Sequence, residues 1–188
     1  MIYHADDTPG LHRIFIGIGC DGDAQEQIEK LIKPLKATFP LFRWVPKMNR
    51  HLTLAFLGNI SSSRLDSVMA AFKNTYEQNS CFHYRLTKLT RFPDSSSRIL
   101  ALVGDPHDQL DLLYRRTTLL LQANHLEPAW SEFKPHITLA RTQKPALSSD
   151  IKDRQVNIPL KVDKIVLYQS VSTASGPVYT ALQETCLD

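Results

Sequence analysis

The feature that most constrains this chain is a five-residue word that occurs twice. Residues 51–55 read HLTLA, and residues 136–140 read HITLA. A word of this pattern is expected by chance in roughly one chain in a thousand, and here it occurs twice. We therefore interpret the two words as copies that share one role.

The repetition extends beyond the words. Their histidines are 85 positions apart, and the same offset places Arg13–Gly19 on Arg98–Gly104. A tryptophan, Trp44 or Trp130, also stands shortly before each word. Two copies of so long a unit indicate one domain of two similar halves rather than an array of short repeats.

Length and composition describe an ordinary globular chain. The 188 residues are 43% hydrophobic and 22% charged, which predicts a single domain over residues 1–188. A net charge of +3 permits a polyanionic partner without demanding one. No C-x-x-C spacing, membrane-length apolar run or secretory signal is visible. We expect a cytoplasmic monomer without a membrane segment, and interpret residues 1–10 as a disordered extension.

The spacing of apolar residues predicts an α+β fold with a largely antiparallel sheet. Asp23 is the expected N-cap of a first helix, which Pro34 should kink or end. Ser61–Ser63 should cap a second helix, and a third is expected over Asp108–Ala123. Strands are expected at Arg13–Gly19, Phe42–Val45, His51–Leu57, Phe82–Phe92, Arg98–Gly104, Pro135–Arg141, Ile158–Leu160, Lys164–Ser170 and Val178–Leu182.

Each repeated word places a histidine and a threonine on one face of a strand. Side chains at positions i and i+2 share a face, so His51 and Thr53 point one way and the leucines point the other. The same alternation applies to His136 and Thr138. If a pseudo-twofold axis relates the halves, the two polar faces line a common cleft.

Two imidazoles and two hydroxyls in one cleft suit acid–base chemistry at phosphorus. Displacement there needs a base on the attacking oxygen and an acid on the leaving oxygen, and imidazole can serve as either near neutral pH. Threonine hydroxyls can hydrogen-bond the non-bridging oxygens as charge develops. A single histidine on a strand is more often structural, but a pair in matched frame favours a shared active site.

A zinc site is the alternative use of paired histidines, because imidazole is a common zinc ligand. Zinc prefers three or four protein ligands, yet no Cys, Asp or Glu stands at ligand spacing beside either histidine. The sequence therefore predicts catalysis without a metal ion or other cofactor. The histidines outside the words are interpreted as surface or structural residues; they are His4, His12, His83, His107 and His125.

The words and their surroundings resemble the two-histidine (2H) phosphoesterase superfamily, whose signature is a pair of H-x-[T/S]-x motifs with apolar x. Within that superfamily the chain is similar to the RNA 2′,3′-cyclic phosphodiesterases, also called 2′-5′ RNA ligases. The similarity runs from residue 13 to about residue 182 and is carried by IFIGI, RWV ahead of HLTLAFLG, FKPHITLAR, LYQS and a later G-x-x-Y.

The resemblance implies two lobes, each an antiparallel sheet backed by helices, with the motifs lining the groove between them. It implies a metal-independent enzyme that opens terminal 2′,3′-cyclic phosphates of RNA to 2′-phosphates. The expected partners are RNA with such ends, or cyclic nucleotides. By the same resemblance His51 is the proton donor and His136 the proton acceptor, while Thr53 and Thr138 bind the phosphate.

Arg141 follows the second word and is a candidate phosphate ligand, because guanidinium binds phosphate through two hydrogen bonds. It is five residues from His136, so a regular strand would point it to the opposite face. The resemblance favours phosphate binding, and both outcomes stay open. Phe56 has the same spacing in the first word, and we expect it in the core together with Trp44 and Phe42 rather than against a base.

Other functions also stay open. A second enzymatic hypothesis is hydrolysis of a small cyclic nucleotide or an ADP-ribose cyclic phosphate. A third hypothesis is a non-catalytic module that binds RNA ends, although both histidines and both threonines are intact. The sequence does not separate hydrolysis from reversible 2′-5′ joining, since both reactions use the same two proton-transfer groups.

Overall fold

The computed structural model describes residues 10–127, 132–142, 151–174 and 176–188. Most of the expected N-terminal extension, and Trp130 before the second word, lie outside these ranges. None of the helices within them is long and apolar enough to span a membrane. The elements are β1 (Leu11–Gly19), α1 (Gly22–Thr38), β2 (Arg43–Trp44), the 3₁₀ turn η1 (Lys47–Asn49), β3 (His51–Ser61), α2 (Ser62–Tyr76), β4 (Phe82–Phe92), β5 (Ile99–Gly104), α3 (Asp108–Ala123), β6 (His136–Arg141), β7 (Arg154–Val162), β8 (Lys164–Thr173) and β9 (Gly176–Cys186).

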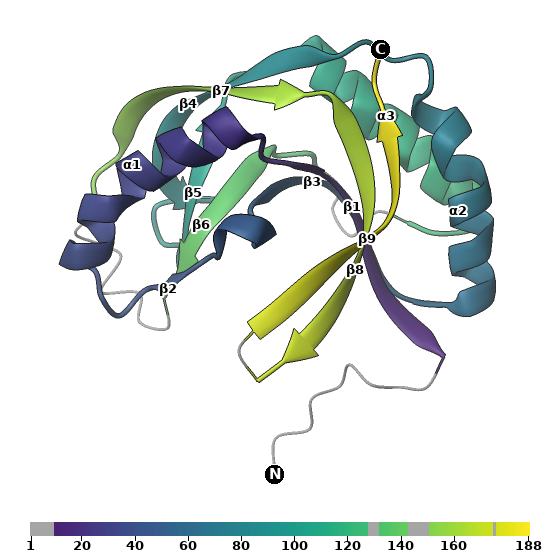
Figure 1. The fold of residues 1–188 in the computed structure, drawn as a ribbon, viewed down its shortest axis with the longest axis horizontal. Coiled ribbons are helices and arrows are strands. Elements are labelled where there is room, and N and C mark those ends of the chain that lie inside the picture. The colour runs from purple at the N-terminus through teal and green to yellow at the C-terminus, as the bar shows by residue number, and fades with distance from the viewer. Residues whose placement is uncertain (1–9, 128–131, 143–150, 175) are drawn as a thin grey trace.

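The described strands form one antiparallel sheet in the order β7-β4-β5-β6-β3-β1-β8-β9, with β2 paired to β6. This order mirrors the sequence repeat, because β6 and β3 carry the two words at the centre and β5 and β1 flank them. The sheet arches across the molecule (Figure 1). The predicted α+β class with antiparallel pairing is confirmed. The two halves, however, share a continuous sheet instead of forming two separate ones.

The two halves of the sheet meet at a narrow seam between β3 and β6. Their backbones pair at one position, Leu52 with Ile137. Both side chains are fully buried in the core. Elsewhere β3 pairs with β1, and β6 pairs with β5. The seam therefore joins the repeated words directly, and β2, which precedes the first word, adds a second link by pairing with Ala140 and Arg141 of β6.

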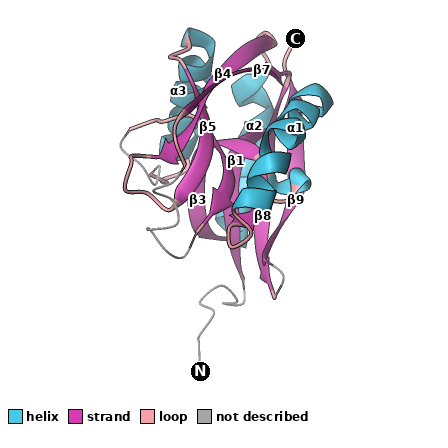
Figure 2. Ribbon diagram, turned by 90° about the vertical axis from the view of Figure 1, so that its left-hand side faces the viewer, coloured by secondary structure: helices cyan, strands magenta, loops and turns pink. Residues whose placement is uncertain are grey.

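α1 and α3 occupy equivalent places in the repeat. Each packs on the half of the sheet that does not contain the strand preceding it in the chain. α1 follows β1 but packs against β7, and α3 follows β5 but packs against β3 and α2. Ile28 and Ile32 are buried on α1, and Leu110 and Leu113 on α3. The strands lie between α3 and α1 in Figure 2. This crossing ties the two halves into one hydrophobic core.

The start of α1 corrects a prediction. Its N-cap is Asp21 rather than Asp23. One carboxylate oxygen of Asp21 accepts a hydrogen bond from the backbone N–H of Ala24 at 2.8 Å, and the other accepts one from the N–H of Lys161 on β7 at 2.7 Å. A short-range capping pattern cannot reveal the second bond. Asp21 therefore both caps the helix and attaches it to the sheet.

Pro34 does not end α1 at that point. The helix continues to Thr38 with Pro34 inside it. A proline leaves the carbonyl four residues earlier without its helical hydrogen bond, here that of Lys30. Lys30 and Pro34 are both exposed, so water can satisfy this carbonyl. The buried face of α1 keeps its packing.

The remaining elements lie close to their predicted positions. The third helix covers Asp108–Ala123 as predicted, and Ser61 caps α2 by accepting a hydrogen bond from Arg64 N. β3 continues beyond the predicted end at Gly58, which adopts φ +73°. A non-glycine residue rarely takes this conformation, so Gly58 lets the strand bend and still pair with β1 up to Ser61.

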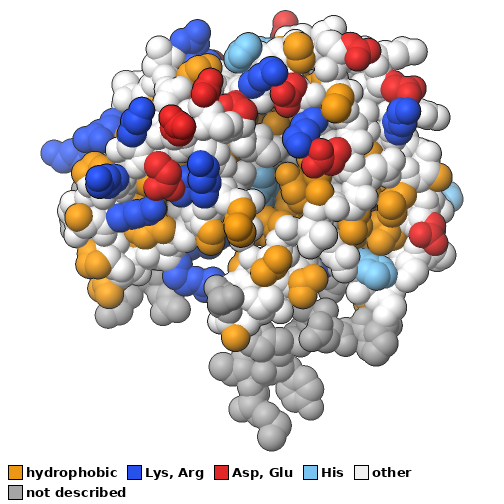
Figure 3. Space-filling model, in the orientation of Figure 1, with side chains coloured by type: hydrophobic (Ala, Val, Ile, Leu, Met, Phe, Trp, Pro, Cys, Tyr) orange, Lys and Arg blue, Asp and Glu red, His pale blue; other side chains and the backbone are white. Residues whose placement is uncertain are grey.

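Charged side chains of both signs are interspersed over the face shown in Figure 3. On α1, for example, Lys30 and Lys33 are exposed together with Glu26. This mixture agrees with the small net charge of +3. This face offers no broad surface of one sign.

Gly104→Ala tests the close contact of β4 with β5. Gly104 is the counterpart of Gly19 in the repeat, and a Cβ on it would lie 2.1 Å from Arg85 O and 2.7 Å from the Tyr84 ring. The substitution should lower the free energy of unfolding by about 1–3 kcal/mol, because the strands must move apart. Urea unfolding followed by circular dichroism measures the change. Gly22→Ala is the control, since a Cβ there meets nothing within 4 Å; equal stability of the two variants would contradict the prediction.

Candidate active site

Both repeated words open onto one cavity of about 840 Å³. The cavity is formed by strands, loops and the end of η1, and none of the residues that line it belongs to α1, α2 or α3. All five residues that the sequence analysis singled out lie in its wall; they are His51, Thr53, His136, Thr138 and Arg141. The structure therefore brings the two polar faces together, as the pseudo-twofold argument expected.

The seam between β3 and β6 decides how the words face each other. Leu52 pairs with Ile137, and the strands run in opposite directions. In an antiparallel pair, the residue before one partner lies opposite the residue after the other. Each histidine is therefore directed toward the threonine of the other word. The polar face of the seam alternates imidazole and hydroxyl from the two halves.

A β-bulge occurs at the same place in both words. The ladder of β3 against β1 skips Leu54, and the ladder of β6 against β5 skips Leu139. In each word this leucine and the following alanine are both buried in the core. An extra residue reverses the alternation of faces for the residues that follow it. Phe56 and Arg141 consequently return to the cavity face.

The bulges correct predictions that assumed regular strands. Arg141 lines the cavity, so the argument that it faces away from His136 is wrong. Phe56 also lines the cavity, and its expected core position is wrong for the same reason. Trp44 packs against the core and lines the cavity as well, whereas Phe42 is buried as predicted. The adjacent Leu-Ala in each word is the signal that could have revealed the bulges.

Backbone carbonyls hold both imidazoles in the same orientation. His51 Nδ1 lies 2.8 Å from the carbonyl oxygen of Asn49, and His136 Nδ1 lies 2.9 Å from that of Lys134. A carbonyl only accepts, so each Nδ1 carries a proton and donates it. In the neutral ring Nε2 then has no proton and can act as a base. Each carbonyl belongs to the residue two positions before its histidine, so the internal repeat extends to these two hydrogen bonds.

Aromatic rings surround both histidines. The His51 ring lies 4.7 Å from the centroid of Phe15 and meets Tyr179 edge-on at 5.2 Å. The His136 ring stacks on Phe92 with a centroid distance of 3.8 Å. These contacts fix the ring planes and remove water from around the imidazoles.

Burial lowers the pKa of both histidines. For His51 burial is the largest cause and lowers the pKa from 6.5 to about 4; the bond to Asn49 raises it, and the charges of His136 and Arg141 lower it. Burial also lowers the pKa of His136, where the bond to Lys134 acts in the opposite direction and Arg141 acts in the same direction. Both imidazoles are therefore neutral at pH 7 in the unliganded protein.

Asn49 and Arg50 hold the turn that precedes His51, and no sequence motif pointed to them. Asn49 Nδ2 donates a hydrogen bond of 2.7 Å to the carbonyl of Pro177 on β9. The guanidinium of Arg50 is only 3% exposed; it donates to Gln25 at 3.2 Å and forms an ion pair with Glu29. The Glu29 carboxylate compensates the buried charge. Together these bonds connect the wall at His51 to α1 and to β9.

The cavity offers proton-transfer groups and anion ligands. Within the ranges that the structure describes, no three His, Cys, Asp or Glu side chains are grouped so as to hold a metal ion. The groups available are two neutral imidazoles, two threonine hydroxyls and one guanidinium. Such a set can move protons and bind a phosphoryl group.

Arg141→Ala should raise the pKa of both histidines. Arg141 lowers the pKa of His51 and of His136 through its positive charge, so its removal makes each imidazolium less unfavourable. An NMR titration of the imidazole resonances measures the two pKa values. Arg141→Lys keeps the charge and serves as the control. Unchanged values in the alanine variant would show that the guanidinium does not act on this cavity.

The chain is similar to known proteins along most of its length. It matches the model of the 2′-5′ RNA ligase superfamily over residues 23–173. An RNA 2′,3′-cyclic phosphodiesterase of Aquifex aeolicus (strain VF5) is 28% identical over 180 residues, which are 92% of this chain and 95% of the relative. A protein of the same name from Aeropyrum pernix is 30% identical over 148 residues, or 72% of this chain and 81% of the relative.

Solved structures agree with this similarity. A crystal structure of a Thermus thermophilus protein has a TM-score of 0.79 and 26% identity, covering 93% of this chain and 97% of that one. The crystal structure of E. coli LigT complexed with phosphate has a TM-score of 0.71 and 26% identity, covering 95% and 98%. The family match includes both repeated words and the strands that carry them. The chain therefore belongs to the 2′-5′ RNA ligase superfamily.

Proposed function

We propose that this chain is a metal-independent RNA 2′,3′-cyclic phosphodiesterase that opens terminal cyclic phosphates to 2′-phosphates. One observation carries the proposal: both imidazoles are held through Nδ1 by backbone carbonyls, which leaves two Nε2 atoms available to one cavity. The names of the relatives support the substrate class, and the crystal structure of E. coli LigT complexed with phosphate supports binding of a phosphate group by a protein of this fold.

In the proposed reaction His136 accepts a proton and His51 donates one, an order that follows the resemblance to the 2H phosphoesterases. Water attacks phosphorus while Nε2 of His136 takes its proton. The bond between phosphorus and the 3′ oxygen breaks, and Nε2 of His51 protonates that oxygen. The products are a 2′-phosphate and a 3′-hydroxyl, and the two imidazoles have exchanged protonation states.

Thr53, Thr138 and Arg141 bind the phosphoryl group in this scheme. The hydroxyls reach it from opposite sides of the seam, because each word contributes one. They donate to the non-bridging oxygens, on which negative charge increases as water attacks. The guanidinium of Arg141 neutralises that charge from the end of β6.

Because the pKa of His51 is low, we infer that the bound substrate helps to protonate this proton donor. At pH 7 the unliganded cavity holds a neutral His51, whereas the scheme needs its imidazolium. A phosphodiester anion beside the ring favours the charged form and raises its pKa, opposing burial and Arg141. Substrate binding is therefore accompanied by proton uptake, and the donor becomes charged only when there is a leaving group to protonate.

Alternative functions use the same cavity. One is hydrolysis of a small cyclic nucleotide or an ADP-ribose cyclic phosphate, and another is non-catalytic binding of RNA ends. Reversible 2′-5′ joining would use the same two histidines in the reverse direction. The retention of both histidines and both threonines supports catalysis. We also propose a single bilobal domain over residues 1–188 that acts as a cytoplasmic monomer; the crossed packing of α1 and α3 supports one domain.

The proposal is tested with nucleoside 2′,3′-cyclic phosphates and a cyclic-phosphate-ended oligonucleotide, assayed in EDTA. Turnover should persist in the chelator. His51→Ala and His136→Ala should each remove most of the rate. The double variant should lose far less than the product of the two single losses, because the pair acts as a unit. Inactivation by EDTA with recovery on addition of zinc or manganese would overturn the two-histidine mechanism, and binding of the RNA end without turnover would support the non-catalytic module.

Thr53→Val and Thr138→Val test the phosphate ligands. Each change keeps the shape of the side chain and removes its donor. Loss of one oxyanion donor typically costs roughly 10²–10³ in rate, so kcat should fall by about that factor. Steady-state kinetics give the loss, and Thr180→Val, at an exposed position of β9 outside the catalytic cavity, is the matched control. Wild-type kcat in both test variants would assign the two hydroxyls to strand structure alone.

A further inference from the structure

We propose that a second cavity, adjoining the catalytic one, binds the nucleotide on the 5′ side of the cyclic phosphate, so that the chain acts on RNA ends in preference to mononucleotides. This inference rests on the proposed function and narrows its substrate class. A nucleoside 2′,3′-cyclic phosphate would occupy the catalytic cavity only. An oligonucleotide would occupy both.

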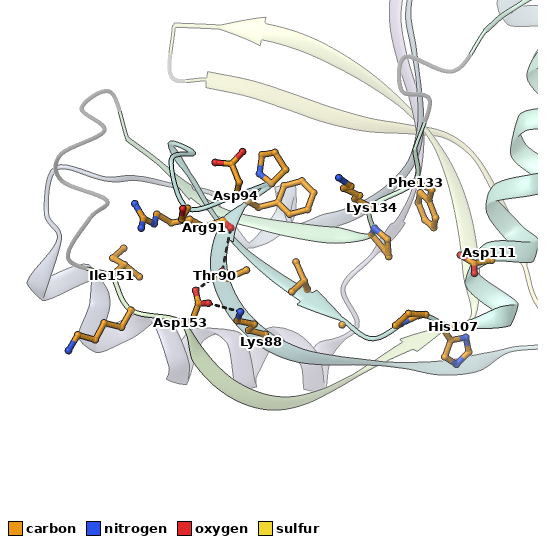
Figure 4. Close-up of a pocket in the computed structure, with 18 residues that line it drawn as sticks. Lys88, Thr90, Arg91, Asp94, His107, Asp111, Phe133, Lys134, Ile151 and Asp153 are labelled. Carbon is orange, nitrogen blue, oxygen red and sulfur yellow. Dashed lines mark hydrogen bonds and ion pairs between the residues drawn. The ribbon is translucent and has the colours of Figure 1, made fainter.

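The second cavity has a volume of about 940 Å³ (Figure 4). It shares a wall with the catalytic cavity, because Phe92, Pro93, Phe133 and Lys134 line both. Its volume is in the range of pockets that bind small ligands. A strand whose terminal phosphate lies between the two histidines can therefore pass this wall and place its next nucleotide in the second cavity.

The strand register places the second cavity on the same face of the sheet. Val103 of β5 pairs with His136 on one side and with Lys88 of β4 on the other. Neighbouring strands lie ~4.8 Å apart, so the backbone of Lys88 is roughly 10 Å from that of His136. Thr90 and Phe92 follow Lys88 at intervals of two and share its face. Arg91 stands between them, next to the end of β4, and its side chain lines the cavity despite this alternation. Neighbouring nucleotides of one strand can span that separation.

Two cationic side chains of β4 line this cavity, Lys88 and Arg91, and we assign the phosphate contact to Arg91. Lys88 Nζ lies 2.5 Å from Asp153, and Thr90 Oγ1 donates to the same carboxylate at 2.6 Å (Figure 4). Asp153 is thereby compensated within the protein. The Arg91 guanidinium lines the cavity and makes no hydrogen bond or ion pair with another described residue, although its charge also acts on the Asp94 and Asp153 carboxylates. It can bind the phosphodiester that joins the last two nucleotides.

Of the other two acidic side chains in the lining, Asp111 lies in the first turn of α3 and Asp94 is engaged within its own loop. Asp94 accepts hydrogen bonds from the backbone N–H of Ser96 at 2.8 Å and from its hydroxyl at 2.5 Å. These bonds direct the carboxylate to its own loop and lower its pKa. Lys152 adds positive charge to the lining, whereas Lys134 is paired with Glu132 at 3.0 Å. An anionic backbone therefore meets Arg91 and Lys152, while Asp94 and Asp153 are engaged within the protein.

Two aromatic rings in the shared wall can stack on bases. Phe92 stacks on His136 with a centroid distance of 3.8 Å. Phe133 stacks on Tyr114 of α3 at 4.4 Å and 5°. Each ring is held from one side, and both line the two cavities. Because every base has a π-face, stacking here favours single-stranded RNA without selecting its sequence.

The test compares kcat/KM for a nucleoside 2′,3′-cyclic phosphate with that for the dinucleotide ending in the same cyclic phosphate. We expect the dinucleotide to be favoured by at least about tenfold, the size of one stacked base with its phosphate contact. Arg91→Glu should remove most of this advantage and leave hydrolysis of the mononucleotide intact. Arg64→Glu makes the same charge change on α2, away from both cavities, and should keep the advantage. Arg91→Gln, which adds no negative charge, should give an intermediate loss.

The outcomes separate this inference from the function on which it rests. Equal kcat/KM values for the two substrates would overturn the second binding site and leave the phosphodiesterase proposal standing. An advantage that survives Arg91→Glu, or that disappears equally in Arg64→Glu, would also overturn it. If neither substrate is hydrolysed, the proposed function fails and this inference fails with it.

Discussion

The pairing of Leu52 with Ile137 is the contact on which the rest of the structure depends. It joins the two halves of the sheet at a single ladder position, with both side chains fully buried. Since neighbouring side chains on a strand point to opposite faces, burial of this pair turns the histidines and threonines beside it toward the cavity. The active site is thus a consequence of how two similar halves are joined.

The internal symmetry reaches further than the two words. Each word contains a bulge at its fourth residue, Leu54 or Leu139. Each histidine also donates through Nδ1 to a carbonyl two residues earlier. Yet Phe56 and Arg141, which occupy equivalent positions, are an aromatic ring and a cation. The bulges bring both to the cavity, so its wall carries an aromatic ring at one of these positions and a positive charge at the other.

Burial and hydrogen bonding act on the histidines in opposite directions. Removal of water lowers the pKa of His51 to about 4, and the bond to Asn49 opposes this shift. The packing that orients His51 through Phe15 and Tyr179 is also the packing that keeps it neutral. In the function proposed above, such a site holds its base in place and acquires its acid when an anion binds. Orientation and protonation are therefore both set by the same apolar surroundings.

The sequence by itself determined the repeated words, the strands that carry them, the α+β class and the convergence of four polar side chains on one cleft. These features depend on short-range periodicity, which a sequence displays directly. The tertiary structure decided the N-cap at Asp21, where a bond to β7 outweighs the local motif. It also decided the position of Arg141, because a bulge depends on the neighbouring strand, and the anchoring of His51 by Asn49 and β9. Such contacts join residues that are distant in the chain, and no pattern within either segment records them.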